Sequence, residues 1–150
     1  MASGPALISP IPNMSRDSIP VVCAIIEREG FVLLAKRPAD KHLGGKWEFP
    51  GGKVETGESP STAIVREIKE ELGGEFLPRT ELQRSLHEYE KITIEMIPII
   101  GRLTNSSANL ICHEHDQIVW VRSEELSNYD LAPADYPVLE NYFKTLSDHA

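Results

Sequence analysis

The sequence is short of several features that define whole classes of protein. Its 150 residues include only two cysteines, Cys23 and Cys112, which excludes a small scaffold stapled by disulfides. No apolar run approaches the roughly 20 residues that a membrane-spanning helix needs. Positive charge is also scarce, because 15 Lys and Arg accompany 23 Asp and Glu and leave a formal net charge of −8. Such a chain repels phosphate backbones, so we expect neither a nucleic acid polymer nor a membrane as partner.

The rest of the composition is that of an ordinary globular domain. Hydrophobic residues make up 41% of the chain, which excludes general disorder and allows one domain with a substantial core. Residues 1–18 contain three prolines and no basic segment ahead of an apolar one. We expect them to form a flexible N-terminal extension without a secretory signal, followed by a single domain over residues 19–150. Two cysteines without an evident partner suit the reducing cytoplasm.

Hydrophobic patterning predicts both strands and helices. Strands are indicated by runs of β-branched and apolar residues between turn residues, and helices by apolar side chains that recur on one face. The expected strands cover residues 20–26, 31–35, 47–50, 82–89, 92–103 and 117–122, and the expected helices cover residues 60–72 and 136–146. Pro98 marks its strand as an edge strand or the site of a bulge. The fold class is therefore α/β in the broad sense, either α+β or an α/β sandwich.

The ends of the first helix carry clear local signals. Ser59 supplies an N-cap hydroxyl, Pro60 is favoured in a first helical turn, and Gly73 is a typical C-cap. Ser123, which precedes two glutamates, is expected to cap a short helical turn later in the chain. These signals fix which side chains the helix over residues 60–72 presents together.

That helix carries a cluster of negative charge. Glu67, Glu70 and Glu71 follow i, i+3, i+4 spacing, which places them on one arc roughly 100° wide. Like charges so close raise one another's pKa unless a cation is present, and carboxylate ligands suit Mg²⁺ or Mn²⁺. In an acidic protein such a cation would also mediate the binding of an anionic substrate. The alternative is a solvated helix face on which Arg66 and Lys69 neutralise the glutamates.

The residues around the helix favour the metal site. The segment from residue 52 to residue 73 resembles the Nudix box, and it holds every fixed position of that box: Gly52, Glu58, Arg66, Glu67, Glu70, Glu71 and Gly73. The one departure is Gly74, where the family prefers an aliphatic residue. The resemblance extends over about residues 20–143, with further matching segments at residues 35–40, 47–53 and within 113–135. It is to the MutT-type branch, and most of all to bacterial pyrophosphohydrolases of CTP and modified pyrimidine triphosphates.

The resemblance implies a fold and a metal site. The Nudix fold is a mixed β-sheet sandwiched between α-helices. In the family the helix glutamates, here Glu67, Glu70 and Glu71, bind divalent metal, and a backbone carbonyl that corresponds to Gly51 is a further ligand. Glu114 matches a loop glutamate that binds metal or acts as the general base.

Two further residues of the box complete the expected catalytic set. Glu58 corresponds to a glutamate that supports the metal site without binding metal itself. Arg66 is expected to pair with it, because a bidentate arginine–carboxylate pair would fix the geometry between loop and helix. His113 and His115 flank Glu114, but two histidines without a cysteine pair are a weak indication of zinc.

The substrate contacts are less specific. Arg37 and Lys53 are the expected cations for phosphate oxygens, although each could equally be a solvated surface charge. Asp135 matches the position that reads the base edge in MutT-type enzymes, and its alternative role is to cap the C-terminal helix. Phe49 and Trp47 are candidates to stack on a base, with core packing as the alternative.

We therefore expect a metal-dependent (deoxy)nucleoside triphosphate pyrophosphohydrolase that releases a nucleoside monophosphate and pyrophosphate. The cofactor would be Mg²⁺, with Mn²⁺ as a substitute, and the substrate a small nucleotide such as a CTP or dCTP analogue or 8-oxo-dGTP. One alternative is a pyrophosphatase of nucleoside diphosphate sugars such as ADP-ribose. Another, from a different class, is a Nudix module that binds nucleotides without catalysis. The sequence leaves open whether the chain is a monomer or a homodimer.

Overall fold

The computed structural model describes residues 18–105 and 109–148. Of the expected N-terminal extension, residues 1–17 lie outside this range, and Ser18 is already the first residue of a strand. The strands are β1 (Ser18–Arg28), β2 (Phe31–Lys36), β3 (Trp47–Glu48), β4 (Gly51–Lys53), β5 (Phe76–Glu81), β6 (Ser85–Glu88), β7 (Thr93–Leu103) and β8 (Gln117–Arg122). The helices are α2 (Pro60–Leu72) and α3 (Tyr136–Asp148), with short 3₁₀ helices η1 (Ser123–Asn128) and η2 (Pro133–Asp135).

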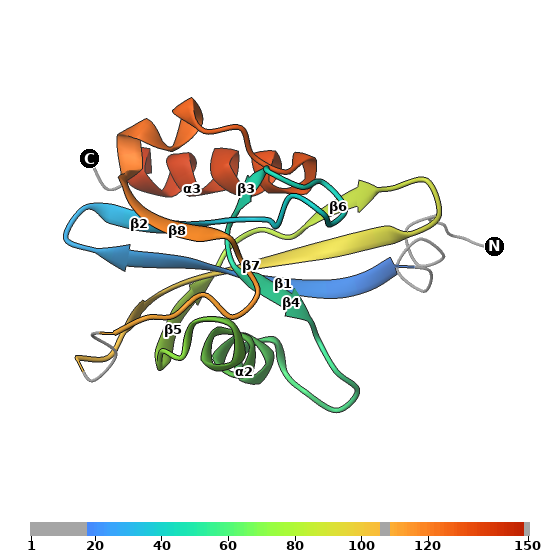
Figure 1. Cartoon of the computed structure of the whole chain (residues 1–150), viewed down its shortest axis with the longest axis horizontal. Coiled ribbons are helices and arrows are strands. Elements are labelled where there is room, and N and C mark those ends of the chain that lie inside the picture. The colour runs from blue at the N-terminus through green and yellow to red at the C-terminus, as the bar shows by residue number, and fades with distance from the viewer. Residues whose placement is uncertain (1–17, 106–108, 149–150) are drawn as a thin grey trace.

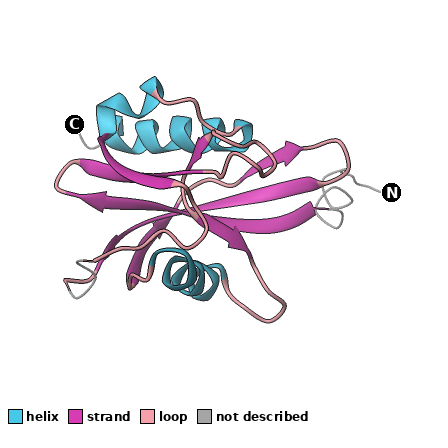
Figure 2. Cartoon of the chain, in the orientation of Figure 1, coloured by secondary structure: helices cyan, strands magenta, loops and turns pink. Residues whose placement is uncertain are grey.

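The sheet is mixed and lies between the two α-helices, as expected. Its main strand order is β3-β2-β1-β7-β5, in which β1 and β7 run parallel and the other pairs run antiparallel. Figures 1 and 2 show the strands between α3 on one side and α2 on the other. No helix in the described part of the chain is both long and apolar enough to cross a membrane.

Strand β1 changes partners along one of its edges, and this opens the sheet at the site described below. Its first half pairs with β4, from Val21 opposite Lys53 to Cys23 opposite Gly51. Its last residues, Glu27 and Arg28, pair instead with β2, while the opposite edge pairs with β7 from Ser18 to Ile26. Strand β4 therefore lies beside β1 next to the point where β1 changes its partner from β4 to β2.

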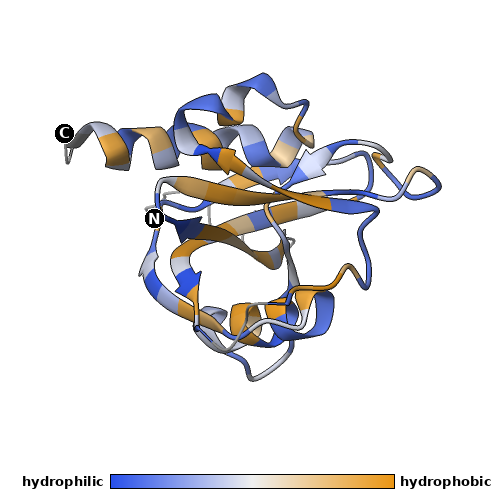
Figure 3. Ribbon diagram, turned by 60° about the vertical axis from the view of Figure 1, so that its left-hand side comes forward, coloured by the Kyte–Doolittle hydropathy of each residue, from blue (hydrophilic) through white to orange (hydrophobic). Residues whose placement is uncertain are grey.

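Both faces of the sheet are buried, because side chains of β1 alternate between two cores. Cys23 and Ile25 pack toward α3, whereas Val22, Ala24 and Ile26 pack toward α2. The central strands are accordingly apolar on both faces, and Figure 3 shows them predominantly orange among bluer loops. The two helices therefore cover a sheet that cannot face water, which fixes α2 firmly beneath the glycine-rich strand β4.

Helix α2 has the ends that the sequence predicts. The Ser59 hydroxyl accepts a hydrogen bond from the Thr62 backbone N–H at 3.1 Å, and Pro60 occupies the first turn. Gly73 ends the helix in the left-handed region, with φ 72°, which glycine adopts without strain. The apolar side chains of Ile64 and Ile68 are fully buried against the sheet. The adjacent arc of the helix is therefore left free to carry the glutamates.

The secondary structure departs from the expectations at three points. Residues 76–81 form the strand β5, which the sequence hid because it is an exposed edge strand with a bulge after Pro78. Pro98 lies in the central strand β7, not at an edge, and its carbonyl accepts from the Leu82 backbone N–H where β5 gives way to β6. The proline thus faces an interruption in the neighbouring strands. Ser123 begins η1 but makes no capping bond, because the cap position belongs to Arg122.

Candidate active site

Two adjacent glycines at the start of β4 bring the backbone unusually close to its neighbours. A side chain on Gly51 would collide with the backbone of Val22 in the paired strand β1. A Cβ on Gly52 would lie 2.5 Å from the carboxylate of Glu67 on α2. Strand β4 and the acidic arc of α2 therefore pack with only hydrogen atoms between them at this point.

Arg66 connects the loop before α2 to the acidic arc of that helix. Its guanidinium donates to both carboxylate oxygens of Glu58, with Nε–Oε2 at 2.7 Å and Nη2–Oε1 at 2.9 Å. It also donates to Glu67 at 3.1 Å, to Glu70 at 3.3 Å and to the backbone carbonyl of Lys53 at 3.1 Å. The Arg66 guanidinium lowers the pKa of Glu58 to about 2. The expected Arg66–Glu58 pair is confirmed, and it joins loop, helix and β4.

Glu71 is the most deeply buried of the helix carboxylates. Its burial, its hydrogen bond to Glu67 and the negative charges of Glu67, Glu114 and Glu48 raise its pKa to about 10. Its Oε1 atom has no hydrogen-bond partner among the described residues. A carboxyl oxygen that is buried, unpartnered and surrounded by other carboxylates is arranged to meet a cation.

The loop between β7 and β8 carries Glu114 toward this cluster. The His113 backbone N–H donates to the Glu71 carbonyl at 3.1 Å, and the Asp116 N–H donates to the Lys36 carbonyl at 3.0 Å. Glu114 lies between these two anchors and lines a pocket of about 590 Å³ together with Glu71 and Gly51. The structure thus brings Glu114 and Glu71 to one pocket, although they are far apart in the sequence.

The carboxylates of α2 have the chemistry that suits a hard divalent cation. Glu67 and Glu71 are in contact, Gly52 leaves room beside them, and the unpartnered oxygen of Glu71 is a ready ligand. The ligands are all oxygens, which suits Mg²⁺ or Mn²⁺. Among residues 18–105 and 109–148, however, no three acidic, His or Cys side chains converge closely enough to bind a metal as they stand. Glu67 and Glu70 are each paired with the guanidinium of Arg66, and Glu70 is half exposed.

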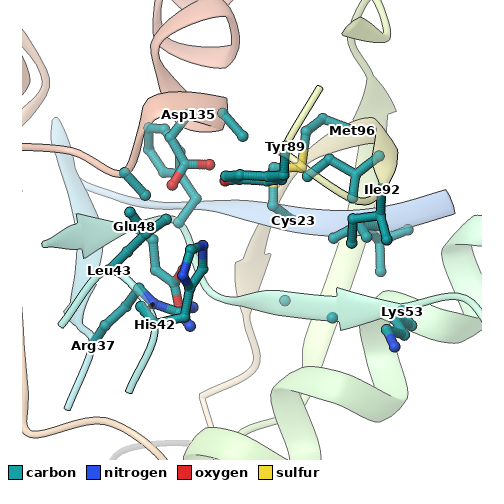
Figure 4. Close-up of a pocket in the computed structure, with 18 residues that line it drawn as sticks. Cys23, Arg37, His42, Leu43, Glu48, Lys53, Tyr89, Ile92, Met96 and Asp135 are labelled. Atoms are coloured by element: carbon teal, nitrogen blue, oxygen red, sulfur yellow. Dashed lines mark hydrogen bonds and ion pairs between the residues drawn. The ribbon is translucent and has the colours of Figure 1, made fainter. Parts of the chain in front are cut away.

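A second pocket of about 360 Å³ adjoins the first, on the other side of Glu48 and Arg37. Its lining combines strands β1, β4 and β7 with the loop that follows β2 and the segment before α3. In Figure 4, Asp135 and Glu48 point into this space from one side, and Tyr89 and Ile92 lie on the other. The volume lies within the range of small-ligand pockets, and a few polar groups among apolar walls are typical of them.

Asp135 is a carboxyl group deep in this second pocket, with only 3% of its surface exposed. Burial raises its pKa well above the usual range, the charge of Glu48 adds to this, and a hydrogen bond from the Phe49 backbone N–H acts in the opposite direction. The Asp135 carboxyl group is thus hydrogen-bonded to the backbone directly after β3. Asp135 is placed to present one carboxyl oxygen to a bound molecule.

The other predicted contact residues lie around the same space. Arg37 lines both pockets, where its Nη1 donates to Glu48 at 3.0 Å. Lys53 is exposed at the rim. Phe49 lines the pocket but is 2% exposed and part of the core, and Trp47 packs edge-on against Tyr129 at 5.4 Å. The packing of both rings agrees with the core alternative.

Sequence reasoning missed three residues that the structure places at the site. Glu48 separates the two pockets, His115 hydrogen-bonds to Glu48 through Nε2 at 2.8 Å, and Tyr89 lines the second pocket from the hairpin between β6 and β7. His115 and Glu48 are 67 positions apart, so no local spacing connects them. The only available signal was the position of His115 directly after Glu114.

The comparisons with known proteins point to one family. The family model described as NUDIX domain matches residues 21–141. The CTP pyrophosphohydrolase of Escherichia coli strain K12 is 42% identical over 132 residues, an alignment that covers 83% of this chain and 90% of that protein. The 8-oxo-dGTP diphosphatase of Proteus vulgaris is 36% identical over 77 residues, covering 51% and 69%. The solution structure of the E. coli ORF135 protein superposes with a TM-score of 0.77 and 41% identity, covering 91% of this chain and 94% of that one.

Proposed function

The chain belongs to the NUDIX domain family of hydrolases, and from this premise we propose that it is a metal-dependent (deoxy)nucleoside triphosphate pyrophosphohydrolase. It would act on small nucleotides and release a nucleoside monophosphate and pyrophosphate, in the manner of an enzyme that clears unwanted triphosphates. The named relatives act on CTP and on 8-oxo-dGTP, which supports a triphosphate substrate for this chain.

One observation carries the proposal. A pocket lined by Glu71 and Glu114 shares the wall of Arg37 and Glu48 with a pocket that has Asp135 at its base. A nucleotide has the same two parts, a multiply charged phosphate chain and a base with hydrogen-bonding edges. The two pockets therefore match the two ends of one substrate.

We place the cofactor at the acidic arc of α2. Glu67, Glu70 and Glu71 would hold Mg²⁺ or Mn²⁺, together with Glu114 and the backbone carbonyl of Gly51. When bound, the metal neutralises phosphate charge and lowers the barrier to attack by water. Arg66 keeps Glu67 and Glu70 beside β4 through its pairing with Glu58, so these two carboxylates are positioned before substrate arrives.

The chain's own residues then bind the phosphates and transfer the proton. Arg37 lines both pockets and binds phosphate oxygens that need a positive partner, and Lys53, at the rim of the second pocket, offers another cation. Glu67 or Glu114 takes the proton from the attacking water, whose oxygen forms a new bond to phosphorus while the bridging P–O bond breaks. When water attacks the α-phosphorus, the bridging oxygen leaves with pyrophosphate. The other product is the nucleoside monophosphate.

Base recognition falls to the second pocket. Asp135 would form a hydrogen bond with the base edge: in its charged form it accepts from an exocyclic amine such as that of cytosine, and in its protonated form it donates. The high pKa of Asp135 favours the protonated form in the free protein. Either form prefers some bases over others, so the pocket is expected to discriminate among triphosphates.

The experiment is a panel of triphosphates incubated with the protein and Mg²⁺, with products separated by chromatography. The panel holds CTP, dCTP, 5-methyl-dCTP, dGTP, 8-oxo-dGTP and ATP, with ADP-ribose and an EDTA control alongside. The proposal predicts monophosphate and pyrophosphate from a preferred triphosphate, and no product in EDTA. Hydrolysis of ADP-ribose alone would move the substrate to the nucleoside diphosphate sugars, and nucleotide binding without any product would indicate a non-catalytic module.

We also propose that residues 19–150 act as one catalytic domain and that the protein works in the cytoplasm. The family match over residues 21–141 supports the first point. Free thiols at Cys23 and Cys112 support the second, because a reducing compartment keeps such thiols unpaired. Fractionation of cells followed by detection of the protein would test the location.

A further inference from the structure

His115 is a buried histidine at the boundary between the two pockets. Its side chain is only 5% exposed, and its Nε2 lies 2.8 Å from Glu48 Oε2. Its other nitrogen, Nδ1, faces Oε1 of Glu71 at 4.0 Å, and neither of these two atoms has a hydrogen-bond partner among the described residues. One imidazole ring thus lies between a residue of the dividing wall and a residue of the acidic cluster on α2.

The wall itself depends on His115. Glu48 has two carboxylate oxygens, of which Oε1 accepts from Arg37 Nη1 at 3.0 Å and Oε2 faces His115. Arg37 is held in turn by its Nε, which donates to the His42 carbonyl at 2.7 Å. The wall is therefore a chain of three side chains that ends at His115, and without His115 one oxygen of Glu48 loses its partner.

His115 also fixes the loop that carries Glu114. The backbone of this loop is tied at His113 to the Glu71 carbonyl and at Asp116 to the Lys36 carbonyl. Between these two ties, the only buried side chain is that of His115, whereas Glu114 next to it is exposed. The hydrogen bond from His115 to Glu48 thus holds the part of the loop that carries Glu114.

We propose that His115 is a positioning residue that couples the base pocket to the phosphate side of the site. It holds Glu48 toward the base pocket and, through the same hydrogen bond, holds the loop that places Glu114. A base that fits against Glu48 thereby stabilises the arrangement of Glu114 that is needed for hydrolysis. This inference rests on the proposed function, because it assigns the two pockets to the two ends of one nucleotide.

The test compares His115→Ala, His115→Gln and a control, Gln117→Ala. A glutamine amide places an N–H donor where Nε2 lies, so it restores the bond to Glu48, whereas alanine cannot. Gln117 is an exposed residue at the start of β8, directly after the same loop, and it lines neither of the two pockets. The readouts are kcat and KM for the preferred and the second-best triphosphate of the wild-type panel, with the unfolding midpoint of each variant.

In His115→Ala we expect kcat to fall about tenfold or more, and the preference between the two triphosphates to shrink several-fold. His115→Gln is expected to recover most of both quantities, and Gln117→Ala to change neither. A merely structural role would lower the unfolding midpoint and the amount of folded protein, but it would leave KM and the preference of the folded fraction unchanged.

The outcomes separate this inference from the function on which it rests. An active wild-type enzyme whose kcat and substrate preference survive His115→Ala would overturn the role of His115 alone. The same holds if His115→Gln is as impaired as His115→Ala, since the hydrogen bond to Glu48 would then be irrelevant. A wild-type protein that hydrolyses no triphosphate would overturn the proposed function, and this inference with it.

Discussion

Arg66 grips Glu58 through two parallel hydrogen bonds, at 2.7 and 2.9 Å, and the same guanidinium reaches the carboxylates of Glu67 and Glu70. One side chain therefore connects the loop before α2 to the acidic arc of the helix. Because a guanidinium is a planar fork, it fixes the direction of its partners as well as neutralising them. The position of the carboxylates that we propose to hold the metal is thus set by a residue that need not touch the substrate.

Replacement of Arg66 by lysine tests this role. Lysine keeps the charge but loses the two-pronged bond to Glu58, so we expect turnover to fall at least about tenfold while the protein stays folded. The control is Arg84→Lys, because Arg84 makes a similar two-bond contact with Glu81 at an exposed position outside both pockets. Equal turnover in the two variants would show that charge alone suffices at Arg66.

Gly52→Ala tests the close packing of β4 against α2. A Cβ at this position would lie 2.5 Å from the Glu67 carboxylate, so we expect that carboxylate to move and turnover to fall about tenfold or more. Gly30→Ala is the contrasting control. Gly30 has φ +84° with open space around it, so alanine there is strained and lowers the free energy of unfolding by about 1 kcal/mol without affecting catalysis. Turnover in both variants is compared with their urea unfolding curves.

The features of the site that sequence reasoning predicted are those specified by neighbouring residues. The ends of α2 follow from Ser59 and Gly73, and the pairing of Arg66 with Glu58 follows from positions eight residues apart. Each of these depends on local geometry. The dividing wall does not, because His115 meets Glu48 only after β2, β3 and β8 have been assembled into one sheet.

The fold shows the same division. Strand β1 was recognised because its apolar run is buried on both faces. Strand β5 escaped notice because only Phe76, its first residue, is buried and the rest face water. Pro98 predicts an edge strand or a bulge, but the break between β5 and β6 accommodates the proline within the sheet. The sequence of β7 therefore gives no sign of the interruption between β5 and β6 that accommodates Pro98.

Asp135 should make the stability of the protein depend on pH. Its pKa is raised in the folded state by burial and by Glu48, whereas in the unfolded chain it is about 3.9. Above pH 4 the folded form therefore holds a proton that the unfolded form has lost, and the free energy of unfolding falls as the pH rises, by up to about 1.4 kcal/mol per pH unit. We expect Asp135→Asn to make this slope shallower above pH 4, whereas the part that comes from the raised pKa of Glu71 remains.

Urea unfolding at several pH values measures this effect. The matched control is Asp130→Asn, because Asp130 is an exposed aspartate outside both pockets whose carboxylate accepts from Lys46 Nζ at 2.9 Å. It should leave the slope of the wild-type protein unchanged. A wild-type slope that persists in Asp135→Asn would mean that Asp135 is charged in the folded protein.

Divalent metal should stabilise the protein as well as activate it. Glu67 and Glu71 are held in contact, and one oxygen of Glu71 has no partner among the described residues, so a bound cation relieves an unfavourable arrangement. We expect the unfolding midpoint to rise with added Mg²⁺ or Mn²⁺ and to return to its starting value in EDTA. Glu71→Gln should weaken this response, whereas a response of full size in that variant would place the metal elsewhere.

The most direct test of the account is the turnover of Glu70→Gln and Glu71→Gln on the preferred triphosphate with saturating Mg²⁺. Each variant keeps the size of the side chain and removes one negative charge from the acidic arc of α2. We expect both to lose nearly all pyrophosphate release while they remain folded by circular dichroism. Glu140→Gln, which changes an exposed glutamate on α3, should match the wild type. Wild-type turnover in both α2 variants would contradict the assignment of these glutamates, and with it the proposed catalytic site.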